Sequence, residues 1–476
     1  MADLIENRPL PELHVGDTAS LTRNFTQDDL ETFALMSGDV NPAHVDDAFA
    51  ASAPFHKVVA HGMWSAALIS NVLGTQLPGP GTTYLGQVLK FLAPVFVGDT
   101  VRVTVTVASI DAAPGKAPRA TLHCLVTNQR NETVVAGDAE VLVPTEKVQR
   151  PRVHLPQLEL RDPGAKLRKL VDQARDALSG AGRQPLRTAI VHAVDAVSLG
   201  GAIDAARAGL VDPVFVGPEA RIRAAAEAAH IDLSPYPIVG TEHSHAAASL
   251  AVAMARSGKV QAVMKGSLHT DELMHAVLDG ATGLRTDRKV SHVFVIDVVG
   301  RSGLQLVSDA AINVLPDLAT KRDIVQNAID LAHALGIASP KVAILSAVET
   351  VNPNIPSTID AAALCKMADR GQITGAILDG PLAFDNAVSA EAARTKGINS
   401  PIAGIADVLI APNLEAANML AKQLEYLGEA KVAGLVVGTR VPVVLTSRAD
   451  LPDARMASCA LAVLLDAARG SVPRAV

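Results

Sequence analysis

The pattern of apolar and polar positions differs between the two ends of the chain. Near the N-terminal end, apolar and polar residues alternate in long segments such as "TVRVTVTVASI", residues 100–110, where valine occupies every second position. A period of two indicates strands with one buried face. "RATLHCLVTNQ" and "TVVAGDAEVLVP" repeat the pattern and are separated by turn-rich stretches. We therefore expect a sheet of long antiparallel strands.

Two helices are predicted before these strands. "TQDDLETFALMSG" has Thr26 as an N-cap, acidic residues in its first turn and Gly38 to end it. "HGMWSAALISNVLG", residues 61–74, is apolar on all sides, which is typical of a central buried helix. One buried helix among antiparallel strands indicates an α+β domain, which we assign to residues 1–147.

Beyond residue 164 the pattern changes to short, wholly apolar runs between Ala-rich amphipathic segments. Examples are "TAIVHAV", "PVFVG", "HVFVIDV" and "PVVLTS". Such runs predict a mainly parallel sheet covered by helices on both faces, and residues 164–476 are long enough for two subdomains with a ligand cleft between them. Residues 148–163, rich in Pro and charges, are interpreted as a linker, with an edge extension of the first domain as the alternative.

Composition and charge narrow the class of protein. Of the 476 residues, 49% are hydrophobic and 19% are charged, which is typical of folded globular domains, and the formal net charge is −7. An acidic chain is not expected to bind nucleic acid or anionic membranes nonspecifically. No stretch is long and apolar enough to suggest a membrane span, and three scattered cysteines fit a reducing compartment. We therefore expect a cytoplasmic protein.

The first candidate site lies in "SGDVNPAHVDDAF", residues 37–49. Gly38 and Pro42 interrupt regular helix, so the chain can turn Asp39 and His44 toward one point. A carboxylate that orients an imidazole suits acid–base chemistry on water. Asn41 is expected to hold the segment through side-chain-to-backbone hydrogen bonds, as is Asp46 two residues beyond His44. By residue type alone, an ordinary polar loop is the alternative.

The wider stretch "SGDVNPAHVDDAFAASAPFHKVVAHGMWSAALIS" resembles the MaoC-type (R)-specific enoyl-CoA hydratases. The family's D-x-N-P-x-H-x-D motif corresponds to Asp39, Asn41, Pro42, His44 and Asp46. Its H-G-M motif begins at His61, and "LKFLAPVFVGDTV" matches the strand that follows. The resemblance covers roughly residues 12–145 and implies the hot-dog fold.

This resemblance implies a mechanism in which Asp39 and His44 activate a water molecule that adds to the β-carbon of a trans-2-enoyl thioester. The backbone N–H of Gly62 would stabilise the negative charge on the thioester oxygen. Asn41 and Ser70 would contribute to substrate binding, although a serine inside a helix often only bonds to a backbone carbonyl. A hot-dog thioesterase is the competing activity.

The second candidate site follows "PVVLTS". This strand delivers Ser447 and Arg448 at its C-terminal end, where α/β proteins commonly bind ligands. A serine hydroxyl can donate to a developing oxyanion, and an arginine fork suits phosphate. The alternative is a helix cap beside a surface charge. Neither a P-loop nor a G-x-G-x-x-G motif is present in the sequence.

Five segments resemble the phosphate acetyltransferase and phosphate butyryltransferase family: "VMKGSLHTDELMHAVLD", "GLRTDRKVSHVFVIDV", "NPNIPSTIDAAAL", "ILDGPLAFDNAVS" and the stretch ending in "VVLTSRAD". The resemblance runs from about residue 165 to the C-terminus. It implies acyl transfer between CoA and phosphate on a two-subdomain α/β fold like that of isocitrate and isopropylmalate dehydrogenases. Ser447 and Arg448 match the catalytic pair, with Arg448 as phosphate ligand.

The resemblance also points to four further residues that are expected to bind the substrates. Arg285 and Arg288 are expected to be further anion ligands by their position in a family motif. Lys265 and Asp385 also stand in family motifs and are expected to bind substrate, with a helix-end charge and a local cap as the respective alternatives.

One position departs from the family pattern. The acetyltransferases carry an aspartate six residues after the arginine, as base for the CoA thiol, and this chain has Ala454 there. Asp453 is the expected substitute, although a one-residue slip turns a helical side chain by about 100°. Activation of the thiol by a residue elsewhere in the chain is the alternative to Asp453. The departure favours the butyryltransferase side. A noncatalytic acyl-CoA-sensing or oligomerising domain is the alternative.

No metal site is expected. His243 and His245 in "TEHSH" would share the face of a strand, but the sequence supplies no third ligand. The two resemblances imply CoA, acyl-CoA thioesters and phosphate as substrates, without a tightly bound cofactor. They also imply a homo-oligomer, a dimer or larger.

Overall fold

The computed structural model describes residues 4–153, 162–445 and 451–470. The chain divides into two compact units, residues 1–160 and 161–476, and each is described by itself. In the first unit the bounds are β1 Leu4–Glu6, β2 Thr18–Asn24, α1 Gln27–Ser37, α2 Pro42–Val45, α3 Asp47–Ser52, α4 Gly62–Thr75, β3 Thr83–Phe91, β4 Thr100–Asp111, β5 Arg119–Asn128, β6 Thr133–Leu142 and β7 Gln149–Pro151, with a 3-10 turn at Leu10–Glu12.

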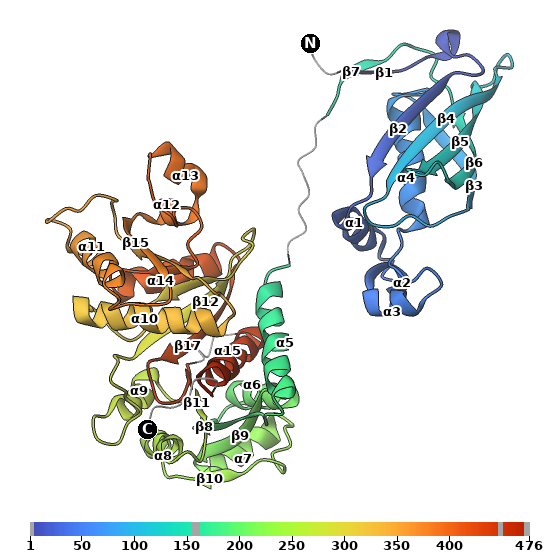
Figure 1. Cartoon of the computed structure of the whole chain (residues 1–476). Coiled ribbons are helices and arrows are strands. Elements are labelled where there is room, and N and C mark those ends of the chain that lie inside the picture. The colour runs from blue at the N-terminus through green and yellow to red at the C-terminus, as the bar shows by residue number, and fades with distance from the viewer. Residues whose placement is uncertain (1–3, 154–161, 446–450, 471–476) are drawn as a thin grey trace. The chain divides into compact units, whose positions relative to one another are not determined.

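The first unit is an antiparallel sheet packed on one buried helix. Its five strands follow the order β2-β4-β5-β6-β3, and α4 lies along the sheet (Figure 1). The alternating valines of β4 point into the core and pack with Trp64 and Ile69 of α4. The predicted helices and strands of this region are confirmed, and so is the cap: Thr26 forms a capping box with Asp29, and Gly38 ends α1 at φ 74°.

The segment predicted as a linker begins with a strand. β7 pairs antiparallel with β1, with Ile5 opposite Arg150. Residues 149–151 thus extend the first unit, as the alternative interpretation anticipated. The following residues 154–161 of the predicted linker lie outside the described residues.

The second unit contains one eleven-stranded sheet with helices on both sides. Its strands are β8 Leu186–Val191, β9 Val211–Gly217, β10 Ile238–Gly240, β11 Ala262–Lys265, β12 Ser291–Asp297, β13 Gln305–Ser308, β14 Lys341–Leu345, β15 Ile377–Leu382, β16 Val408–Ile410, β17 Lys431–Val437 and β18 Val443–Val444. Its helices are α5 Ala165–Gly180, α6 Ala196–Arg207, α7 Glu219–Ala228, α8 Ser244–Arg256, α9 Thr270–Leu278, α10 Leu318–Ala334, α11 Pro356–Asp369, α12 Phe384–Val388, α13 Ala390–Thr395, α14 Leu414–Tyr426 and α15 Pro452–Gly470.

The strand order β10-β9-β8-β11-β18-β17-β12-β13-β16-β14-β15 divides this sheet into two parallel halves. β17 runs antiparallel to both of its neighbours, β18 and β12, and β13 runs antiparallel to β12. The prediction of a mainly parallel, helix-covered sheet is therefore confirmed, with an antiparallel centre that it did not include. Helices α6, α7, α8 and α9 surround one half, and α10, α11 and α14 surround the other (Figure 1).

The half of the sheet formed by β10, β9, β8, β11 and β18 has two edges that matter for function. β8, β11 and β18 are parallel, so they all end at one edge, which we call the Lys265 edge after the last residue of β11. They all begin at the opposite edge, which we call the Leu186 edge after the first residue of β8. β12 is antiparallel to β17, which is antiparallel to β18, so β12 also begins at the Leu186 edge.

Candidate active sites

The segment after α1 is folded by its own polar side chains. Asn41 caps α2, a single helical turn that begins at Pro42, and its side-chain oxygen accepts the N–H of Ala43 at 3.1 Å. This turn corrects the expectation that the segment contains no regular helix, because proline at the first helical position loses no hydrogen bond. Asp46 in turn caps α3. The predicted local hydrogen bonds of Asn41 and Asp46 are confirmed.

This fold brings Asp39 and His44 together. A carboxylate oxygen of Asp39 and one ring nitrogen each of His44 and His61 lie within 4.8 Å of one another. Nδ1 of His44 lies 2.7 Å from the carbonyl oxygen of Val59. Because a carbonyl can only accept, Nδ1 carries the hydrogen, and neutral His44 then has a lone pair on Nε2. In that tautomer Nε2 offers the lone pair that a general base requires.

The third member, His61, was not among the residues predicted from the sequence to do chemistry. It is only 3% exposed, and its Nε2 donates to the carbonyl oxygen of Asp39 at 2.9 Å. Its ring lies against the ring of His44, with centroids 4.0 Å apart. Its Nδ1 is buried and has no hydrogen-bond partner among the described residues. The signal in the sequence was its place directly before Gly62.

Asp39, His44 and His61 are also the group that could hold a metal ion within the described part of the chain. However, the planes of the two imidazole rings are only 31° apart and the rings lie over one another. Metal-binding lone pairs lie in the ring plane, so stacked rings direct them side by side instead of toward one point. The arrangement therefore suits proton transfer better than metal ligation.

Gly62 lines an apolar cavity of about 490 Å³. It is the first residue of α4, where backbone N–H groups have no partner within the helix. A β-carbon at Gly62 would lie 3.0 Å from Cε1 of Phe91, so glycine keeps the N–H accessible. The cavity walls are mostly apolar side chains: Phe55, Val59, Met63, Phe91, Leu92, Val95, Val134 and Val135. An acyl chain fits such a lining.

The predicted substrate-binding serine is not part of this cavity. Ser70 is exposed on α4, whereas Ser65, one and a half turns earlier, is buried and lines the cavity. A helix turns about 100° per residue, so five residues place these serines on opposite sides of α4. Among the described residues, Ser65 is the serine that lines this cavity.

The second candidate site occupies the Lys265 edge. Lys265 is 6% exposed, and its Nζ donates to the carbonyl oxygen of Gly266 at 3.4 Å. A β-carbon on Gly266 would lie 2.4 Å from the carbonyl oxygen of Val191, so only glycine fits where the chain leaves β11. The predicted pair Ser447 and Arg448 lies outside the described residues. β18, which precedes them in the sequence, runs parallel to β11 and ends at the same edge.

A hydrogen-bond network that the sequence did not suggest lies at this edge. Oγ of Ser267 donates to Oδ2 of Asp195 at 2.7 Å, and the N–H of Ser198 donates to Oδ1 at 2.7 Å. Burial alone would raise the pKa of Asp195, but these hydrogen bonds outweigh it and lower the pKa below its ordinary value. Beside them, burial and then Arg221 lower the pKa of His192. Asp195 is thus held as a carboxylate and His192 as a neutral ring.

Asp453, the expected base for the CoA thiol, lies in the first turn of α15. It lines a cavity of about 250 Å³ together with Gly164, Arg168 and Lys431. The pKa of Arg168 is raised, mainly by its hydrogen bond to Asp162, while burial acts in the opposite direction. The negative charge of Asp453 adds to this rise. Asp453 therefore faces α5, and its described neighbours do not include Lys265.

The three remaining predicted ligands lie elsewhere in the second unit. Arg285 and Arg288 precede β12 and so belong to the Leu186 edge, and Arg288 forms an ion pair with Asp330. Asp385 follows β15, at the far end of the sheet, where a hydrogen bond from Lys396 at 2.9 Å lowers its pKa. The structure does not bring these residues together with Lys265.

Two other sequence interpretations can be compared with the structure. His243 caps α8 by accepting the N–H of Ala246 at 3.2 Å, and His245 lies 3.6 Å from Glu272. Both histidines thus have ordinary structural partners. Among the described helices, none has the length and hydropathy needed to cross a bilayer.

Comparison with known proteins matches each unit separately. A family described as "Phosphate acetyl/butaryl transferase" matches residues 239–463, and a family described as "MaoC like domain" matches residues 13–122. A phosphate acetyltransferase of Rhizobium meliloti is 60% identical over 296 residues, which cover 62% of this chain and 94% of that protein. A phosphate butyryltransferase of Clostridium acetobutylicum is 43% identical over 279 residues, covering 59% and 93%.

Among solved structures, a branched-chain phosphotransacylase from Enterococcus faecalis V583 is similar to the second unit. It is 31% identical, with a TM-score of 0.53, and the match covers 59% of this chain and 99% of that one. The relatives carry the names of acetyl-, butyryl- and branched-chain acyl-transferring proteins, so the comparison leaves the acyl group open.

Proposed function

The chain belongs to the phosphate acetyl/butyryltransferase family, and from that premise we propose that it is a bifunctional acyl-CoA enzyme. The MaoC-like domain hydrates a trans-2-enoyl-CoA to an (R)-3-hydroxyacyl-CoA. The second domain transfers an acyl group reversibly between CoA and phosphate. CoA thioesters, CoA and phosphate are the substrates.

The observation that carries the hydratase proposal is the meeting of Asp39 and His44 at His61, which lines an apolar cavity together with its neighbour Gly62. Nε2 of His44 takes a proton from water while Asp39 orients that water, and the oxygen adds to the β-carbon. Charge moves through the former double bond to the thioester oxygen, where the N–H of Gly62 stabilises it. Return of a proton to the α-carbon completes the addition of one water molecule. The cavity that Gly62 lines takes the acyl chain.

For the transferase we propose that phosphate attacks the thioester carbonyl and that CoA leaves as its thiol. Arg448 binds phosphate through its fork, and Ser447 donates to the carbonyl oxygen as charge develops there. Lys265 supports this assignment, since it ends β11 next to the strand that leads to the pair. Asp453 faces α5 instead. The carboxylate of Asp195 and the neutral His192 are better placed to exchange the thiol proton.

Three finer proposals accompany these activities. The antiparallel centre between two parallel halves supports a two-subdomain fold like that of isocitrate and isopropylmalate dehydrogenases. The edge strand β3 exposes Tyr84, Leu85, Val88 and Phe91, which supports a homo-oligomer that covers them. Three cysteines without disulfide partners support a cytoplasmic location, where thiols stay reduced.

A product assay of both half-reactions tests the proposal. Wild type, His44→Ala and Arg448→Ala are assayed for hydration of crotonyl-CoA and for acyl phosphate formation from C2 to C8 acyl-CoAs. Each substitution should lower its own activity by at least about 100-fold, the scale of losing acid–base assistance, and leave the other activity unchanged. Arg223→Ala, an exposed arginine paired with Glu219, is the matched control.

Other products would contradict one half of the proposal. Release of free CoA from crotonyl-CoA without hydroxyacyl product would make the first domain a thioesterase. Binding of acyl-CoA without any transfer to phosphate or arsenate would make the second domain a sensor.

A further inference from the structure

A cavity of the second unit lies at the Leu186 edge and is not part of either proposed active site. Its volume is about 1010 Å³. Residues before β8, β11, β18 and β12 line it, together with the C-terminal end of α15. Lys265 and the end of β18 lie at the opposite edge of the same strands. The cavity is therefore separated from the proposed transferase site by the length of these strands.

Arginine dominates the charge of this cavity. Five arginines line it, against three aspartates: Arg183, Arg256, Arg288, Arg440 and Arg469, and Asp287, Asp330 and Asp466. Two of the arginines pair with carboxylates, Arg183 with Asp466 at 3.9 Å and Arg288 with Asp330. The cavity thus carries an excess of positive charge even if all three aspartates are ionised.

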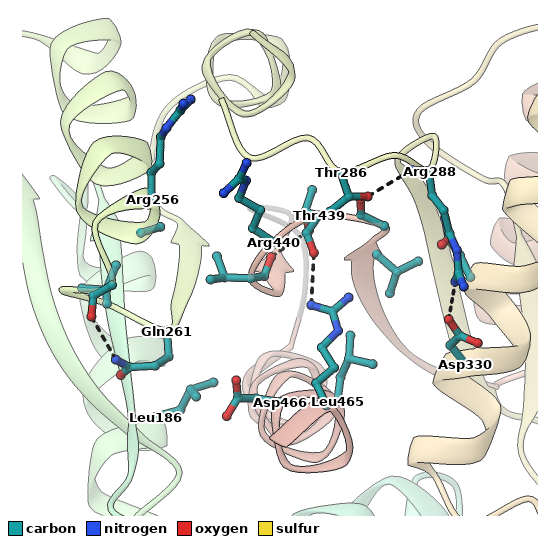
Figure 2. Close-up of a pocket in the computed structure, with 18 of the residues that line it drawn as sticks. Leu186, Arg256, Gln261, Thr286, Arg288, Asp330, Thr439, Arg440, Leu465 and Asp466 are labelled. Atoms are coloured by element: carbon teal, nitrogen blue, oxygen red, sulfur yellow. Dashed lines mark hydrogen bonds and ion pairs between the residues drawn. The ribbon is translucent and has the colours of Figure 1, made fainter. Parts of the chain in front are cut away.

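The other three arginines bond only to backbone carbonyls among the described residues. Arg256 donates to Ala281, Arg440 donates to Arg285 at 3.4 Å, and Arg469 donates to Thr439 at 3.1 Å. Arg256 and Arg440 extend from α8 and from the loop before β18, and Arg288 lies on the far side of Arg440 (Figure 2). Burial lowers the pKa of Arg469, so an anion close to it would stabilise its charged form. Among the described residues, no carboxylate forms an ion pair with the guanidinium group of Arg256 or Arg440.

The rest of the lining sets the size and the apolar character of that ligand. The walls include Leu186, Val260, Val437, Val441 and Leu465. Small-molecule sites of about 300–1,000 Å³ typically combine an apolar wall with a few polar groups. A bare phosphate would leave most of this space unused, whereas a nucleoside phosphate offers a flat base for the apolar wall and phosphates for the arginines.

Both chain crossings between the halves of the sheet run past this cavity. Thr286, Asp287 and Arg288 belong to the crossing from α9 to β12, and Thr439, Arg440 and Val441 belong to the crossing from β17 to β18. The crossings bond to each other, since the N–H of Arg440 donates to the carbonyl oxygen of Leu284 at 2.9 Å. A ligand held by Arg440 and Arg256 would contact the second crossing and the end of α8 together.

We propose that this cavity is a second ligand site, separate from the transferase site, that binds an adenosine-phosphate group. That group occurs in free adenine nucleotides and at the nucleotide end of CoA, so ADP and CoA are the two sources to distinguish. The inference stands on the cavity itself and does not require the transferase activity.

Isothermal titration of the full chain with ADP, CoA and orthophosphate tests the proposal. ADP should bind saturably to wild type and at least about tenfold more weakly to the double variant Arg256→Gln/Arg440→Gln, because charge-assisted hydrogen bonds are lost. ADP binding should be unchanged in Arg448→Ala, because Arg448 is assigned to the proposed transferase site instead. Arg223→Gln is the matched exposed-arginine control, and thermal unfolding of each variant verifies that it is folded.

Competition in the Arg448→Ala protein identifies the source. Displacement of ADP by CoA assigns the site to the nucleotide end of CoA, and ADP binding that CoA does not displace assigns it to free nucleotides. Hydrogen exchange should show ADP-dependent protection in residues 284–290 and 437–443. The proposal is wrong if ADP does not bind, if only orthophosphate binds, if the double variant binds ADP normally, or if protection appears only elsewhere.

Discussion

At the scale of single residues, the hydratase site depends on which ring nitrogens carry hydrogen. The carbonyl of Val59 fixes the hydrogen of His44 on Nδ1, and the carbonyl of Asp39 fixes that of His61 on Nε2. His61 touches both proposed catalytic residues, one through this hydrogen bond and the other through its ring. We therefore interpret His61 as a positioning residue that holds the backbone of Asp39 and packs against His44.

Replacing His61 should slow hydration without abolishing it. In His61→Leu the carbonyl of Asp39 loses its buried donor, which costs about 1–3 kcal/mol and corresponds to a fall of roughly 5- to 150-fold in kcat. His61→Gln keeps an N–H near the position of Nε2 and should retain more activity. Steady-state kinetics on crotonyl-CoA measure both, with KM as the second readout. An equal loss of kcat in the two variants would contradict a role for the hydrogen bond between His61 and Asp39.

At the scale of secondary-structure elements, two glycines set how closely neighbouring segments approach. Gly62 lets α4 begin beside Phe91, a side chain that can move. Gly266 lets the chain leave β11 against the backbone of β8, where the obstacle is the carbonyl oxygen of Val191 and cannot turn aside. The same type of residue therefore has a different cost of substitution at the two sites.

Gly266→Ala should damage the second unit selectively. Its β-carbon would lie 2.4 Å from the carbonyl oxygen of Val191, and relief of that clash separates β8 from β11 at a cost of about 1–3 kcal/mol or more. We expect a lower melting temperature for the transferase unit and loss of acyl transfer, with hydration retained. Calorimetry and the two activity assays measure this.

Gly200→Ala is the control for that experiment. Gly200 lies inside α6, and a β-carbon added there would have no other atom within 4 Å. Because alanine also has a higher helix propensity than glycine, the stability of the variant should be unchanged or slightly higher. Equal behaviour of the two variants would contradict the packing argument.

At the scale of the whole molecule, the two units have separate cores and should respond separately to pH. His292 in β12 is fully buried, and burial lowers its pKa to about 4. The unfolded chain binds this proton near the ordinary pKa of about 6.5, and the folded chain does not bind it until about pH 4. The stabilisation from neutral His292 is thus complete above pH 6.5 and is lost as the pH falls toward 4.

The transferase unit should therefore lose about 3 kcal/mol of stability between pH 6.5 and 4 through this residue. Chemical unfolding of wild type and His292→Leu across that range measures the free energy of unfolding of each protein. The stability of wild type relative to the variant should fall as the pH falls. Asp309, whose pKa burial raises, acts in the opposite direction and is present in both proteins, so the comparison isolates the histidine. A difference independent of pH would contradict the assignment.

Much of the local structure follows from the sequence because its signals are local. The period of two in β4, the caps Thr26 and Gly38, and the apolar α4 each act within one element. The D-x-N-P-x-H-x-D motif likewise contains its own turn and caps, so the meeting of Asp39 with His44 could be expected from it.

Contacts between distant segments were decided only by the tertiary structure. The sequence alone indicated the alternating strands of the first unit, the short apolar strands between helices of the second unit and the turn that joins Asp39 to His44. These features depend on neighbours along the chain. The sequence did not indicate the contact of His61 with His44, the Asp195–Ser267 network, the position of Asp453 beside α5, or the gathering of five arginines at the Leu186 edge. Each depends on how segments that are separated in the sequence pack against one another, and such packing leaves no periodic trace in the chain.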